Sequence, residues 1–72
     1  MATLSENVST NLKTTRLQRK LSQEALAAKA SLSVSYIPML ERGQRSPPLE
    51  ILEQLAKALG VKPVQLLGEP AR

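Results

Sequence analysis

The stretch Ser22–Gly43, SQEALAAKASLSVSYIPMLERG, decides the fold that the sequence predicts. It begins with Ser22, whose side chain is a favoured helix N-cap, and continues with strong helix formers from Ala25 to Ala28. We expect this helix to end near Lys29, because the run Ser31-Leu32-Ser33 interrupts the pattern. A second helix is then expected within a few residues.

Ser33 is expected to cap this second helix, which runs to about Arg42, and Gly43 supplies the positive φ that a helix C-terminus favours. Pro38 conflicts with this prediction, because a proline about five residues into a helix has no N–H for the Val34 carbonyl, at a cost of ~3 kcal/mol. Either the helix begins later than Ser33 or its first turn is distorted. Two short helices joined by about three residues form the helix-turn-helix pattern.

A further helix is expected before this stretch, over residues from about 7 to 19, because apolar side chains recur there at a loose helical spacing. This apolar stripe consists of Leu4, Val8, Leu12 and Leu17. Lys20 follows the helix, where a glycine would end it more comfortably.

Two helices are expected after the stretch. The first starts near Pro47 or Pro48, because proline is favoured in a first helical turn, and it ends at Gly60. Its apolar face consists of Leu49, Leu52, Leu55, Ala56 and Leu59. The second is a short helix from Val64 to Leu67 that starts at Pro63.

These segments together predict an all-α fold, a five-helix orthogonal bundle. We expect one helix-turn-helix domain over residues 1–72, with its core at about residues 7–67 and a loose tail at residues 68–72. Its core is predicted to include Leu26, Ala27, Ala30, Ile37 and Leu40.

The composition argues against an enzyme. The sequence contains no cysteine and no histidine, which removes the commonest metal ligands and the commonest general base. No pair of carboxylates is expected in a pocket, so we expect no metal and no cofactor. A chain of 72 residues is also expected to leave no room for an effector cavity of ~300 Å³ or more, so no small-molecule effector is expected.

The net charge of +4 lies entirely in residues 1–45, which contain seven basic and three acidic residues. Residues 46–72 hold three of each and are neutral. A basic half on a small helical domain favours an anionic partner, of which nucleic acid is the commonest, although a solubilising surface is the alternative. No apolar run is long enough to span a membrane and the N-terminal sequence is unlike a signal peptide, so a cytoplasmic protein is expected.

The residue types within the chain make the helix-turn-helix pattern more specific. The distinctive pieces are Ser22-Gln23-Glu24, Leu26-Ala27, Ser35-Tyr36-Ile37, Leu40-Glu41-Arg42-Gly43, Pro47, Leu55-Ala56 and Ala58-Leu59-Gly60-Val61. Over roughly residues 8–67 the chain resembles the lambda-repressor-like family of the Cro and phage-repressor type. Small members of this family include the controller proteins of restriction–modification systems, and the segment Met39–Pro47 suits that subgroup.

The resemblance implies a sequence-specific, DNA-binding transcriptional regulator that binds a pseudo-palindromic operator as a homodimer. It implies a bacterial, plasmid or phage origin and an association with the nucleoid. An antitoxin-like or other protein-binding module on the same fold is the alternative, which a recognition helix spoiled by Pro38 would favour.

The resemblance also implies roles for individual residues. The expected contacts to DNA phosphates come from Lys13, Gln23, Ser33, Tyr36, Arg42, Gln44 and Arg45. The expected contacts to bases come from Val34, Ser35 and Met39. Arg16 and Glu41 are expected to pair internally, and the ring of Tyr36 has the alternative role of filling a groove. Lys20 and Ser31 stand where the family often has glycine.

A dimer is expected because one recognition helix covers only ~4–5 base pairs, too few to specify a site. The expected dimer interface consists of Pro63, Val64, Leu66 and Leu67. The alternative is that these side chains complete the core of the monomer.

Overall fold

The computed structural model describes residues 3–68, and these residues form five helices and no strand. The helices are α1 (Leu4–Gln18), α2 (Gln23–Ala30), α3 (Tyr36–Glu41), α4 (Leu49–Leu59) and α5 (Pro63–Leu67). The all-α, five-helix prediction is confirmed. Of the predicted tail at residues 68–72, all but Gly68 lies outside the described residues.

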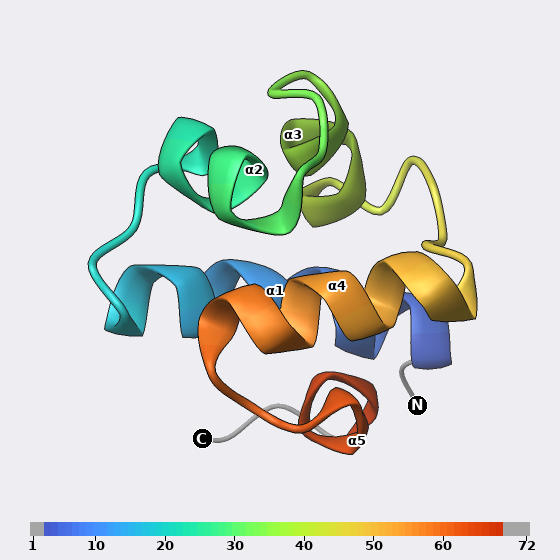
Figure 1. Cartoon of the computed structure of the whole chain (residues 1–72). Coiled ribbons are helices and arrows are strands. Elements are labelled where there is room, and N and C mark those ends of the chain that lie inside the picture. The colour runs from blue at the N-terminus through green and yellow to red at the C-terminus, as the bar shows by residue number, and fades with distance from the viewer. Residues whose placement is uncertain (1–2, 69–72) are drawn as a thin grey trace.

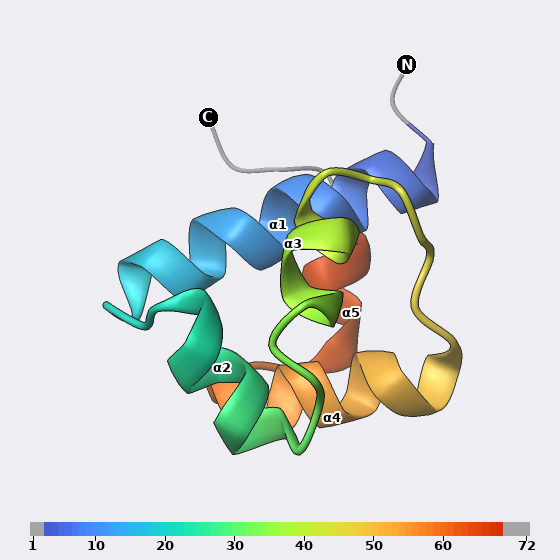
Figure 2. The same ribbon diagram turned by 90° about the horizontal axis from the view of Figure 1, so that it is seen from above.

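The helices are arranged in two levels on either side of α1 and α4. Figure 1 shows α2 and α3 on one side of this pair and α5 on the opposite side. Seen from above, α1 and α4 run along different edges while α3 and α5 overlap between them (Figure 2). The turn between α2 and α3 therefore projects from the side away from α5.

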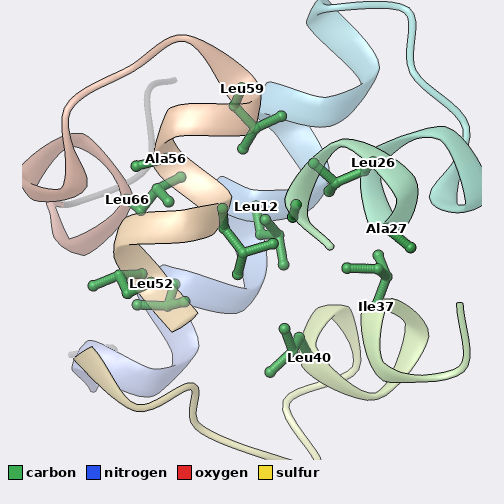
Figure 3. Packing of buried hydrophobic residues seen from close by; sticks show 12 residues of the cluster. Leu12, Leu26, Ala27, Ile37, Leu40, Leu52, Ala56, Leu59 and Leu66 are labelled. Atoms are coloured by element: carbon green, nitrogen blue, oxygen red, sulfur yellow. The ribbon is translucent and has the colours of Figure 1, made fainter. Parts of the chain in front are cut away.

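The core gathers side chains from all five helices (Figure 3). Its buried apolar residues are Val8, Leu12, Leu26, Ala27, Ala30, Ile37, Leu40, Leu52, Leu55, Ala56, Leu59 and Leu66. All five core positions predicted within α2 and α3 are among them, so that prediction is confirmed. Leu4, Leu17 and Leu49 are exposed instead. In the described residues, no helix is long and apolar enough to span a membrane.

Helix α1 begins at Leu4, three residues before the start that was predicted at about residue 7. Thr3 is its N-cap, and its hydroxyl accepts a hydrogen bond from the Glu6 backbone N–H at 3.2 Å. The Glu6 carboxylate in turn accepts from the Thr3 N–H, which completes a capping box. The cap, rather than hydrophobic spacing, sets this end of the helix.

Helix α3 begins at Tyr36, later than the expected cap at Ser33. The residue at the N-cap position is Ser35, and its side chain makes no capping hydrogen bond. Pro38 is therefore the third residue of α3, in the first turn, where a backbone N–H has no partner within the helix. Of the two alternatives left open by the sequence, the later start is the one the structure adopts.

Helix α5 is held against α1 by two asparagines one turn apart. The Asn11 side-chain amide donates to the carbonyls of Leu66 and Gly68 at 2.9 and 2.6 Å, and that of Asn7 donates to the Leu67 carbonyl at 3.4 Å. These bonds satisfy carbonyls at the end of a five-residue helix that has few hydrogen bonds of its own. The asparagines therefore hold α5 on α1, on the side of the molecule opposite to α2 and α3 (Figure 1).

Candidate nucleic-acid interface

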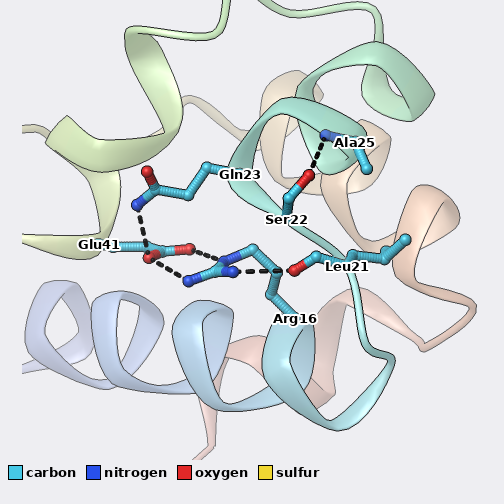
Figure 4. A network of polar contacts seen from close by, with 6 residues as sticks. All are labelled: Arg16, Leu21, Ser22, Gln23, Ala25 and Glu41. Carbon is cyan, nitrogen blue, oxygen red and sulfur yellow. Dashed lines mark hydrogen bonds and ion pairs between the residues drawn. The ribbon is translucent and has the colours of Figure 1, made fainter.

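The interface is built around a buried ion pair between α1 and the end of α3. The Arg16 guanidinium donates to both Glu41 carboxylate oxygens, from Nε at 2.6 Å and from Nη2 at 3.1 Å (Figure 4). The two side chains are only 10% and 4% exposed. Removing one partner of such a pair typically costs about 3–5 kcal/mol, because the other charge stays buried. The structure thus brings together the two residues expected to pair.

The same guanidinium also fixes the start of α2. Arg16 Nη1 donates to the Leu21 carbonyl at 2.8 Å, directly before the N-cap of α2. Ser22 caps that helix as predicted, and its hydroxyl accepts from the Ala25 N–H at 3.0 Å. One buried side chain of α1 therefore contacts the end of α3 and the beginning of α2.

Gln23, the first residue of α2, has its side-chain amide directed toward the ion pair. Its Nε2 donates to Glu41 Oε1 at 3.2 Å (Figure 4). The side chain is half-buried, and its backbone N–H lies in the first turn of α2, where an anion is favoured. The sequence predicted the contact to phosphate but not the bond to Glu41.

Lys13 and Arg42 complete a hollow over this network. The hollow has a volume of about 340 Å³ and is lined by Lys13, Arg16, Gln23, Pro38, Glu41 and Arg42. Because the charges of Arg16 and Glu41 cancel, exposed Lys13 and Arg42 leave the hollow with a net charge of +2. This volume is larger than the ~300 Å³ of an effector cavity that a chain of this length was expected to lack. The hollow is open to solvent, however, and is not a cavity in the core.

Two of the three residues expected to contact bases lie before the start of α3. Val34 and Ser35 are exposed in the turn, and Val34 is 50% exposed. Met39 is half-buried within α3. Ser33 is exposed beside them, and its Oγ lies 3.5 Å from that of Ser35. The residues expected to contact bases thus lie mainly in a projecting turn and not along the face of a long helix (Figure 1).

The remaining residues expected to contact phosphates follow this turn in the chain. The half-buried Tyr36 packs against the core, which is compatible with both of its expected roles. Gln44 and Arg45 are exposed in the loop after α3. That loop is joined to α1 by a 2.6 Å hydrogen bond between the hydroxyls of Ser46 and Ser5, a contact that the sequence analysis missed.

The residues expected to form a dimer interface divide into two groups. Val64 is 65% exposed, and Pro63 and Leu67 are half-buried. Leu66 is fully buried in the monomer core, so its assignment to the interface was wrong. In a five-residue helix that packs on both α1 and α4, one side chain points into the core while its neighbours lie at the edge.

Comparison with known proteins assigns the class. Residues 12–66 match the family described as Helix-turn-helix, so the chain belongs to that family. The expected resemblance to lambda-repressor-like proteins is confirmed. The family and the geometry together define a lambda-repressor-like helix-turn-helix domain.

Particular relatives carry names from transcription control. The chain is 44% identical over 62 residues to the immunity repressor protein of Bacillus phage phi105, covering 86% of this chain and 43% of that protein. It is 47% identical over 47 residues to the control protein C.BamHI of Bacillus amyloliquefaciens, covering 65% of this chain and 58% of that protein. The chain therefore spans about half the length of these two relatives.

A solved structure shows the same arrangement over nearly a whole chain. The restriction–modification controller protein C.AhdI from Aeromonas hydrophila has a TM-score of 0.83 and 37% identity, covering 86% of this chain and 94% of that one. The arrangement of the five helices described above is thus shared with a controller protein of similar size.

Proposed function

We propose that this chain regulates transcription as a homodimer that binds a pseudo-palindromic DNA operator through α2, the turn before α3 and the loop after it. The observation that carries the proposal is the basic hollow of Lys13, Gln23 and Arg42 beside the exposed turn that contains Val34 and Ser35. The family and the relatives named as repressor and controller proteins support DNA binding in transcription control.

Phosphate contacts set the position of the protein on the duplex. Lys13 and Arg42 approach the backbone from the hollow, and Gln23 adds a neutral donor at the start of α2. Arg45 and Gln44 contact the backbone from the loop after α3, and Ser33 and Tyr36 do so through their hydroxyls. These contacts carry most of the affinity and little sequence information.

Base contacts are made by the turn and by α3. Val34 and Met39 contact thymine methyl groups, and Ser35 forms hydrogen bonds with base edges. None of the three side chains makes the bidentate contact by which arginine reads guanine. Direct readout is therefore modest, and sequence preference arises largely from thymine methyls. The later start of α3 leaves Val34 and Ser35 before the helix, and a protein-binding module on the same fold is the alternative function that this displacement favours.

Dimerisation places two turns in successive major grooves. Exposed Val64, together with half-buried Pro63 and Leu67, offers apolar surface on α5. A second copy must pack against this surface so that both turns face the same side of the dimer, because both contact one duplex. Half-sites about 34 Å apart follow from one helical turn of DNA.

The test of this function is the salt dependence of binding to DNA upstream of the chain's own gene. If Lys13, Arg42 and Arg45 each neutralise one phosphate, the slope of log K against log salt is about −3 per half-site, since each contact contributes about −0.9. Fluorescence anisotropy at several salt concentrations measures the slope. No binding, or binding with a slope near zero, would contradict the proposal.

A further inference from the structure

We propose that Glu41 is a positioning residue for DNA binding, which holds the Gln23 amide in the direction from which it donates to a backbone phosphate. The inference rests on the proposed function and assigns to the buried ion pair a role beyond stability. It starts from the hydrogen bond that Gln23 Nε2 donates to Glu41 Oε1 at 3.2 Å.

The chemistry of the amide makes this bond useful. A glutamine Nε2 carries two N–H groups, and one of them is used by Glu41. The second N–H is free to donate to a phosphate oxygen, in a direction set by the first. A glutamine without such a tether loses rotamer freedom when it binds, and that loss lowers affinity.

The charges around Glu41 explain why its carboxylate is tolerated close to a bound DNA phosphate. Glu41 is held by both Nε and Nη2 of Arg16, which neutralises it. Lys13 and Arg42 at the rim then determine the sign of the hollow. Arg16 Nη1 also donates a hydrogen bond to the Leu21 carbonyl at 2.8 Å, so the same guanidinium anchors the backbone just before Gln23.

A paired apolar replacement separates positioning from stability. Replacing Arg16 and Glu41 together by methionine leaves the net charge unchanged, and apolar replacement of a buried ion pair is often neutral for folding. The doubly substituted protein keeps Gln23 but lacks both its tether and the bond from Arg16 to the Leu21 carbonyl. If the Arg16–Glu41 pair has only a structural role, this folded variant binds DNA as tightly as the unmodified chain.

The experiment is a cycle of DNA affinities per half-site, with thermal unfolding measured for each protein. Gln23→Met is expected to weaken binding about tenfold in the unmodified chain, the loss of one charge-assisted hydrogen bond. The R16M/E41M protein is expected to bind about three- to tenfold more weakly, and adding Q23M to it is expected to cost less than threefold more. Unchanged affinity of R16M/E41M, or effects that multiply independently, would overturn the inference.

A second measurement does not depend on the variant folding. In the unmodified protein, NMR relaxation of the Gln23 side-chain amide is expected to report an ordered group, in contrast to exposed Gln54 on α4. Equal mobility of the two amides would overturn the tether. An unmodified chain that binds no DNA would instead contradict the proposed function, which distinguishes the two failures.

Discussion

At the scale of single residues, two turns are occupied by side chains that prefer other backbone conformations. Lys20 and Ser31 have φ angles of 57° and 59°, in the left-handed region. That conformation costs an L-residue roughly 1–2 kcal/mol relative to glycine. These are the positions where the family often has glycine, so the sequence carries a stability cost at both.

Ser31→Gly is expected to stabilise the fold. Relief of the left-handed strain, less the roughly 0.5–1 kcal/mol of chain entropy that glycine loses on folding, leaves a gain of about 0.5–1 kcal/mol. For a domain of this size the melting temperature is expected to rise by about 3–6 °C, as followed by circular dichroism. Ala28→Gly within α2 is the matched control and is expected to destabilise by about 1 kcal/mol. A lower melting temperature for Ser31→Gly would contradict this account of the turn.

At the scale of elements, the position of Pro38 decides how the recognition helix is formed. Pro38→Ala is expected to change the free energy of unfolding by less than about 1 kcal/mol, because a first-turn proline breaks no hydrogen bond within the helix. A proline in a helix interior would cost about 3 kcal/mol, which alanine would recover. Urea denaturation measures the difference, and a gain of that larger size would show that α3 begins before Tyr36.

Elements with strong local signals were predictable from the sequence. Ser22 caps α2, and Gly43 and Gly60 adopt the positive φ expected at helix C-termini. The start of α3 was not predictable, because Ser33 and Ser35 are equally good caps by residue type. The later start is compatible with Pro38 and leaves both hydroxyls exposed.

Contacts between distant elements were the least predictable. The hydrogen bond from Gln23 to Glu41 joins α2 and α3, and no local pattern marks it. Leu66 was assigned to a dimer interface because its short helix seemed too small to bury it, whereas α1 and α4 together do so. The pairing of Arg16 with Glu41 was expected only by resemblance, since sequence spacing alone relates neither residue to the other.

At the scale of the whole molecule, DNA contacts and dimer contacts are expected on different helices. Val64→Glu places a charge at an exposed position of α5, the helix that lies on the side of α1 and α4 opposite to α2 and α3 (Figure 1). We expect this variant to fold normally and to sediment as a monomer at concentrations where the unmodified chain is a dimer, because a charge is costly to bury in an apolar interface. Leu17→Glu, at a position that is 56% exposed on α1, is the control and is expected to remain dimeric. A dimeric Val64→Glu variant would exclude this surface.

The most direct test of the central claim is selection of bound DNA from a random pool, followed by sequencing. A dimer that presents one projecting turn to each half-site predicts an inverted repeat whose half-sites lie about 34 Å, or roughly ten base pairs, apart. Thymines are expected at the positions opposite Val34 and Met39. Enrichment of a single unrepeated half-site, or no enrichment at all, would contradict the claim that this chain is a dimeric, operator-binding regulator.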